Sequence, residues 1–415
     1  MSLAQNSVIA AAHDKPTGRW RALALLATAA FLEMTPWFSA SAVLPQLRAA
    51  WGVTPSAGAW LTISVQLGFV AGALISAALS LADILPPRRL MFIGGALAAA
   101  VNAGLLASHS LASAAPLRFA TGAALALVYP PSLKAMATWF RTGRGTALGI
   151  MVGALTLGSA TPHLINGLGG VRWQNVIIAT SVLTLLGGIL AEFAGHDGPF
   201  PFARARFDPR QFLRMFSDQG VRLSVLGYFG HMWELYAMWT WCAAFFAEAF
   251  RAHGFADPSR AAAFAAFAAI GIGGPGCALG GALGDAWGRT RTVILSLAIS
   301  GACALTIGIV AQYSLCLAIM IGIIWGFSAV ADSAQFSTMV TETADQSYVG
   351  TALTMQLAIG FTLTVATIWL VPVLRESHGW SVAFAILAPG PALGIVAMLR
   401  LMRSPEAARL AGGRG

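Results

Sequence analysis

Long apolar stretches alternate with short polar breaks along almost the whole chain. A helix needs about 20 mainly apolar residues to cross a bilayer. By this measure the pattern predicts twelve membrane-spanning helices. Their expected ranges are 22–46, 59–82, 90–108, 114–138, 145–167, 173–195, 220–247, 260–284, 291–312, 314–340, 348–374 and 380–402.

The longest polar break, residues 196–218, separates the sixth predicted span from the seventh. We interpret it as a cytoplasmic linker between two halves, which makes the chain an all-α membrane protein of two six-helix bundles. The expected divisions are an N-terminal cytoplasmic tail at 1–21, a bundle at 22–195, the linker at 196–218, a second bundle at 219–402 and a cytoplasmic tail at 403–415.

Composition supports a membrane protein and excludes a soluble domain. Hydrophobic residues make up 57% of the chain and charged residues 10%, whereas soluble domains carry about 25% charged residues. The net charge of +9 does not indicate nucleic-acid binding, because the basic residues cluster at the ends of apolar segments. No signal peptide is recognisable, so the first helix is expected to direct insertion.

The distribution of Lys and Arg predicts the orientation. With both termini in the cytoplasm, 19 of the 25 basic residues lie inside, as the positive-inside rule requires for a multi-pass protein of the cell inner membrane. The basic residues expected outside are Arg48, Arg118, Arg172, Arg251, Arg260 and Arg375. The four cysteines suggest neither a disulfide framework nor a metal site, and no cofactor is expected.

The loop after the eighth predicted span reads GGALGDAWGRTR, residues 280–291. Its glycines permit a tight turn between helices, and its Asp can pair with cations and with helix N-terminal amides. The segment resembles the G-x-L-[AG]-D-x-x-G-R signature of the major facilitator superfamily. The resemblance implies a cytoplasmic gating loop. The matching residues are Gly281, Leu283, Asp285, Gly288 and Arg289.

The equivalent loop of the first half, LSLADILPPRRL at 79–90, is a degenerate copy of the same signature. Asp83 is retained, prolines replace the second glycine and the first arginine, and Arg88 and Arg89 follow. The signature therefore occurs twice, which indicates an internal repeat. For this superfamily the repeat implies two bundles with pseudo-twofold symmetry that rock about a central site near the bilayer midplane.

Two further segments resemble superfamily motifs. Arg118 and Gly122 match R-x-x-x-G, which implies a role for Arg118 in proton transfer; the alternative is an arginine that snorkels to the outer interface. Residues 149–162 resemble the glycine-rich antiporter motif, but Ala154 replaces its proline, which favours uptake slightly over export.

Ionisable residues within the spans are the candidate site, because each costs about 2.5–3.5 kcal/mol at the bilayer centre. Glu33 and Glu234 lie at equivalent depths of the first and seventh spans, so both are expected to approach one central cavity. An apolar cavity favours the protonated carboxyl, which suits proton coupling. The alternative for each is a neutral acid bonded to a neighbouring helix.

Other candidates lie near these glutamates in the repeat. His231 precedes Glu234 by three residues and Met238 follows by four, which places them on one helix face. The remaining candidates for the cavity are Trp37, Tyr129, Asp332 and Gln335. Acidic groups flanked by aromatic rings suit a cationic or planar organic solute.

These features favour a monomeric secondary transporter that moves a small organic solute through the lipid bilayer with protons. Multidrug-type efflux is the main alternative. Transition-metal transport through His231, Met238 and Cys242 is less favoured, as is a non-transporting sensor. An enzyme is not expected, since no nucleophile motif, phosphate-binding loop or HExxH pattern occurs.

Overall fold

A computed structural model describes residues 16–169, 172–200, 208–211, 213–345 and 348–415. The secondary structure of this part of the chain is helical, without strands. The first half comprises α2 (Arg19–Glu33), α3 (Ser39–Ala42), α4 (Leu44–Trp51), α5 (Pro55–Gly58), α6 (Trp60–Ala78), α7 (Leu81–Ile84), α8 (Pro87–Ala103), η1 (Gly104–Ala107), α9 (Leu111–Leu125), α10 (Tyr129–Ala137), α11 (Arg144–Gly169) and α12 (Trp173–Ala194).

The linker contributes two short helices, and the second half repeats the pattern of long ones. The linker contains η2 (Pro209–Gln211) and α13 (Arg214–Ser217). The second half comprises α14 (Gln219–Ala252), α15 (Pro258–Gly271), α16 (Gly273–Trp287), α17 (Arg289–Val310), α18 (Leu315–Ala331), α19 (Ser333–Thr343), α20 (Val349–Ala385), α21 (Pro389–Met402) and η3 (Pro405–Gly412).

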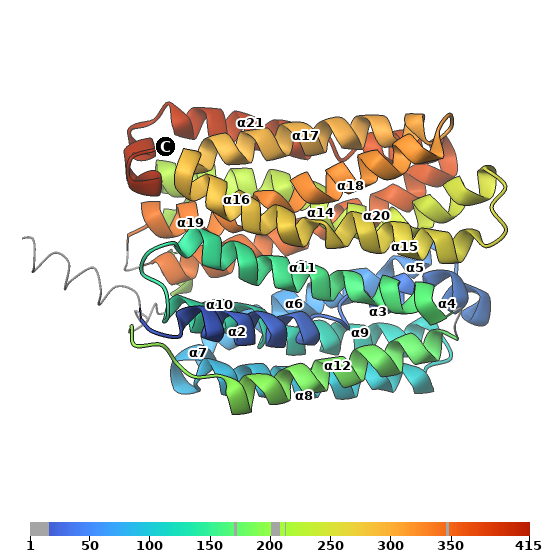
Figure 1. The fold of residues 1–415 in the computed structure, drawn as a ribbon, viewed down its shortest axis with the longest axis horizontal. Coiled ribbons are helices and arrows are strands. Elements are labelled where there is room, and N and C mark those ends of the chain that lie inside the picture. The colour runs from blue at the N-terminus through green and yellow to red at the C-terminus, as the bar shows by residue number, and fades with distance from the viewer. Residues whose placement is uncertain (1–15, 170–171, 201–207, 212, 346–347) are drawn as a thin grey trace, which may run out of the picture.

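The long helices run side by side along the longest axis of the molecule (Figure 1). Nine helical segments of the described chain are long and apolar enough to cross a membrane, which confirms an all-α, multi-pass membrane protein. One of the nine, Val349–Met402, is interrupted at Gly379, where φ is 77°. The predicted first and seventh spans, which are not among the nine, are also helical, as α2 to α4 and α14. The count of twelve crossings stays a prediction.

The two halves of the sequence form two groups of helices. Figure 1 shows the first-half helices in the lower layers and the second-half helices in the upper ones. The groups meet where α11 packs along α15 and α16, and where α6 packs along α20. Both described chain ends lie at the left end in this view, as expected for the predicted even number of crossings.

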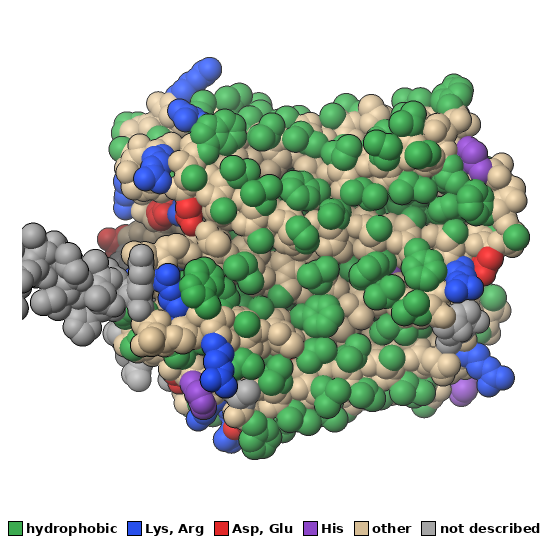
Figure 2. Space-filling view, viewed as in Figure 1, with side chains coloured by type: hydrophobic (Ala, Val, Ile, Leu, Met, Phe, Trp, Pro, Cys, Tyr) green, Lys and Arg blue, Asp and Glu red, His purple; other side chains and the backbone are tan. Residues whose placement is uncertain are grey.

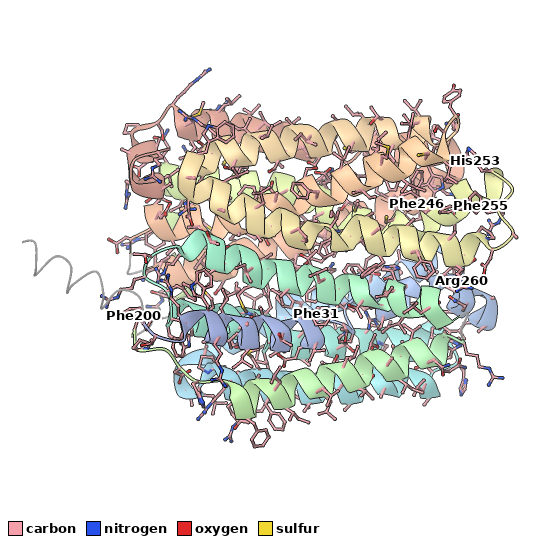
Figure 3. All side chains as sticks on the ribbon, viewed as in Figure 1. Phe31, Phe200, Phe246, His253, Phe255 and Arg260 are labelled. Atoms are coloured by element: carbon pink, nitrogen blue, oxygen red, sulfur yellow. The ribbon has the colours of Figure 1, made fainter. Side chains whose placement is uncertain are left out.

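Surface composition follows the same axis. Hydrophobic side chains cover the length of the molecule, whereas Lys and Arg gather mainly at its left end (Figure 2). Phe200 of the linker lies at that left end, and His253, just after α14, lies at the right end (Figure 3). Because His253 directly follows α14, that helix ends at the right end of the molecule.

Close helix packing depends on glycines at equivalent positions of the two halves. The sequence aligns Gly122 with Gly326. A Cβ at Gly122 in α9 would overlap the carbonyl oxygen of Val65 in α6, and a Cβ at Gly326 in α18 would overlap that of Ala269 in α15. Each helix can approach its partner this closely because no side chain intervenes.

We expect Gly326→Ala to destabilise the protein, because the added methyl group collides with backbone that cannot move independently. Overpacking of this kind costs about 1–3 kcal/mol, which should appear as a lower melting temperature in detergent. Gly271→Ala is the matched control, since its Cβ would lie 3.6 Å from a flexible side-chain atom of Leu157. Equal melting temperatures for the two variants would contradict the packing argument.

Candidate functional site

A cavity of about 60 Å³ lies between the two groups of helices. It draws residues from both halves, including Trp37, Tyr129, His231, Ser333 and Phe361. Pockets that bind drug-sized ligands measure about 300–1,000 Å³. A solute larger than a few water molecules therefore fits only if the bundles separate from this arrangement.

His231 is the titratable imidazole in the cavity wall, and it links two helices. Its Nε2 lies 3.0 Å from the Ser333 hydroxyl, and its Nδ1 lies 2.9 Å from Oδ1 of Asp332. Asp332 occupies the junction between α18 and α19, where the chain departs from a continuous helix. Both side chains of this pair are almost fully buried.

Aromatic rings from both halves cluster at the cavity. Trp37 lies 5.9 Å from Tyr236 and 5.6 Å from Phe361, measured between ring centroids. Phe69 of α6 packs against the same Phe361, with ring centroids 4.6 Å apart and the rings tilted by 44°. The cluster bridges the interface between bundles, and these rings must separate before a solute can pass them.

The structure does not bring Glu33 and Glu234 to this cavity, so the prediction that they face it together is wrong in this conformation. Glu33 lies in the first bundle, with its carboxyl beside Gly95 of α8 and Gly188 of α12. No hydrogen-bond partner for that carboxyl occurs in the described chain. Repeat position predicts a depth for each glutamate, but depth does not specify rotation about the helix axis.

Glu234 is held inside the second bundle. Its carboxylate accepts hydrogen bonds from the Ser300 hydroxyl at 2.9 Å and from the Trp325 indole at 2.5 Å. Residues three apart on a helix differ in direction by about 60°. That difference is enough for His231 to reach the cavity while Glu234 points towards α17 and α18.

Arg118 is fully buried in α9, so it does not snorkel to the outer interface. Its guanidinium instead binds the break between α2 and α3. Nη1 donates to the Pro36 carbonyl at 2.9 Å, and Nη2 donates to the Trp37 carbonyl. Further acceptors are the Leu61 carbonyl, the Ser39 hydroxyl and the Asn102 side-chain oxygen. Arg118 thus positions the segment that carries Trp37 into the cavity wall.

Two other predicted cavity residues lie elsewhere. Met238 is buried in the core and does not line the cavity. Gln335 accepts a hydrogen bond from Arg289 at 3.0 Å and donates to the Gly280 carbonyl at 3.0 Å. Gln335 therefore belongs with the predicted gating loop, about half a turn away from the cavity-lining Ser333.

The predicted gating loop of the second half forms a charged cluster. Arg289 binds both carboxylate oxygens of Glu342 at 2.7 Å, and it lies 3.3 Å from Asp285. Asp285 also accepts the Thr146 backbone N–H at 3.1 Å, at the start of α11. This contact joins the two bundles, as expected for a latch. Gly288 (φ 113°) makes the turn, and a Cβ at Gly281 would overlap the Gly145 carbonyl oxygen.

The first-half loop makes contacts within its own bundle. Arg89 pairs with Glu192 of α12 at 2.8 Å, and Arg88 donates to the Gly195 carbonyl at 3.4 Å. The side chain of Asp83 lies outside the described part of the structure. The described contacts of this degenerate copy thus tie α8 to the end of α12, whereas Asp285 of the second copy contacts the other bundle.

We expect Asp285→Ala to loosen the latch, since the Thr146 amide loses its carboxylate acceptor. A hydrogen bond to a charged group contributes about 1.5–3 kcal/mol, so amide exchange at the start of α11 should accelerate roughly 10- to 100-fold. Hydrogen–deuterium exchange measures this directly. Asp257→Ala, which removes a helix cap at the opposite end of the molecule, should leave that exchange unchanged. An unchanged rate in Asp285→Ala would refute the latch.

Several residues of the site were not predicted from the sequence. Tyr228, Tyr236 and Trp239 line the cavity, and Glu342 completes the charged cluster. The three aromatic residues lie in the same span as His231. In that span the sequence does not distinguish a ring that lines the cavity from one that packs in the core. Glu342 lies just beyond the predicted span 314–340 and 53 residues after Arg289, so the sequence carried no signal that links the two.

The comparisons with known proteins agree with this architecture. A sequence model of the Major Facilitator Superfamily matches residues 26–361, so the chain belongs to this superfamily. Its members are transporters and not enzymes. No curated protein is a significant match to the sequence.

Two solved structures share the fold. One is a D-xylose-proton symporter, with a TM-score of 0.70 and 14% identity over 93% of this chain and 98% of the other. The other is a bacterial homologue of the human lysosomal transporter Spinster, in an inward-facing, unoccupied conformation. Its TM-score is 0.62, with 15% identity over 93% of this chain and 96% of the other.

Proposed function

We propose that the protein is a proton-coupled secondary transporter that takes up a small organic solute by alternating access. The observation that carries this proposal is the His231–Asp332 pair at the cavity between the bundles. The pair would bind a proton when the cavity opens to one side and release it when the cavity opens to the other. Such groups mark proton pathways in transporters because an intramembrane charge is costly elsewhere.

The solute would bind against the aromatic and hydroxyl groups of the cavity. Trp37, Tyr236 and Phe361 offer ring faces, while Tyr129 and Ser333 offer hydroxyl groups. This combination suits a neutral, hydroxyl-bearing planar or ring-shaped solute. The similar fold of a D-xylose-proton symporter supports sugars as the first class to test.

Efflux of amphipathic or cationic compounds is the second candidate. The ring cluster around Trp37 favours it, since aromatic faces attract organic cations. Metal transport gains no comparable support, because Met238 and Cys242 do not join His231 in lining the cavity.

The proposed orientation puts both termini and the Asp285 latch in the cytoplasm of a cell whose inner membrane holds the protein. The excess of Lys and Arg at that end supports it. The proposal also includes two bundles, at 22–195 and 219–402, and a monomer as the transporting unit.

A solute screen tests the function. Purified protein would be screened by thermal shift against pentoses, hexoses, organic cations and aromatic compounds. Each stabilising compound would then be assayed in proteoliposomes. Uptake that accumulates the solute with an inward proton gradient supports symport. Movement of the solute in the direction opposite to the protons supports efflux by antiport. If every ligand moves at a rate that does not depend on the proton gradient, proton coupling is refuted.

A further inference from the structure

A second hollow lies far from the transport cavity, at the end of the molecule where α14 begins and α21 ends. Its volume is about 520 Å³. Three arginines, Arg222, Arg400 and Arg403, contribute to its walls, with Gln219 and Ser404 beside them. Figure 2 shows basic side chains gathered at this end. No acidic side chain is among the described residues that line the hollow.

The arginines are available to an anion. Arg222 donates to the Phe216 carbonyl at 3.2 Å, which holds its side chain near the start of α14. Arg400 and Arg403 are exposed, and neither forms an ion pair within the residues that the structure describes. The two acids nearest in sequence are already engaged: Asp218 by the Val221 amide and the Tyr348 hydroxyl, and Glu406 by Arg409 at 2.9 Å.

Exposed aliphatic side chains continue from the arginines along both helices. Leu226 lies one turn beyond Arg222 on α14, and Val396 lies one turn before Arg400 on α21. Both are exposed, at 43% and 45%, as is Leu393 at 68%. On each helix an arginine near the polar end of the molecule is thus followed, one turn further into the membrane-spanning part, by an exposed aliphatic side chain.

We propose that this hollow binds the phosphate headgroup of an acidic phospholipid, with its acyl chains lying along Leu226 and Val396. Basic pockets between transmembrane helices bind such headgroups, and arginine suits phosphate because its planar fork donates two parallel hydrogen bonds. A free phosphate compound would use the arginines alone. The adjoining aliphatic surface favours a lipid instead.

Native mass spectrometry of the detergent-purified protein tests the proposal. Phosphatidylglycerol, phosphatidylcholine and soluble glycerol phosphate would each be titrated against the protein. We expect one phosphatidylglycerol to bind in preference to phosphatidylcholine. The Arg400→Gln/Arg403→Gln variant should weaken that binding at least about tenfold, a factor worth 1.4 kcal/mol. If this double variant does not fold, Arg403→Gln alone serves.

The matched control is Arg21→Gln/Arg291→Gln, which removes two exposed arginines from the same end of the molecule. It should leave phosphatidylglycerol binding unchanged. Equal weakening by the two double variants would show a diffuse charge effect and overturn the site. Equal binding of phosphatidylcholine would overturn the anionic specificity, and glycerol phosphate that binds as tightly as the lipid would identify a free-phosphate site instead.

Discussion

Asp332→Asn should abolish proton-driven accumulation of the solute while leaving solute exchange across the membrane in place. The substitution keeps the size of the side chain and its place beside His231, but it removes the group that would exchange a proton in the buried pair. We expect accumulation under a proton gradient to fall by at least about tenfold, since a loss of 1.4 kcal/mol of coupling free energy is worth that factor. Gradient-driven uptake and solute counterflow, measured in the same proteoliposomes, separate coupling from binding.

Glu234→Gln is the matched control for this prediction. Glu234 is an equally buried carboxyl of the same bundle, but it points to Ser300 and Trp325 and away from the cavity. Glutamine keeps an oxygen acceptor there, so coupling should persist. If Glu234→Gln uncouples transport and Asp332→Asn does not, the proton site is Glu234, and the assignment to the His231–Asp332 pair fails.

Arg118→Gln should be the most destabilising of the substitutions considered. The guanidinium satisfies buried acceptors at the break between α2 and α3, including the carbonyls of Pro36 and Trp37. Each buried acceptor left without a donor costs about 1–3 kcal/mol. We therefore expect the free energy of unfolding to fall by at least about 3 kcal/mol, with a correspondingly lower melting temperature in detergent.

The control for Arg118 is Arg172→Gln, which removes an exposed arginine of the same half and should leave the melting temperature unchanged. Transport assays add a readout that stability alone does not provide. Because Arg118 holds the backbone of Trp37, folded Arg118→Lys protein should bind the solute more weakly. A variant Arg118→Gln as stable as the wild type would contradict the proposed support of the helix break.

The sequence predicted the architecture well for a physical reason. A lipid environment demands long apolar helices, so the all-α, multi-pass character of the chain depends on the residues of single segments. The Gly281–Arg289 signature is local in the same sense, since a tight turn and its charges occupy one short segment. It therefore predicted the family, which the match over residues 26–361 confirms.

The site was predicted less completely, because its residues must come together from several helices. His231 and Asp332 were both found by their charge, but their pairing depends on how α14 faces the junction of α18 and α19. Glu33 and Glu234 were found by their charge in the same way, but each side chain lies inside its own bundle. Arg118 could be a snorkelling or a buried residue until its partners were known.

The sequence by itself determined that this chain is a helical membrane protein of the major facilitator type, because hydrophobic length and turn chemistry are properties of single segments. The tertiary structure alone decided which polar groups meet. It places His231 beside Asp332, Arg118 at the break between α2 and α3, and Asp285 at the start of α11. Such pairings depend on helix rotation and packing across long sequence separations, where a few tens of degrees move a side chain from the cavity to the core.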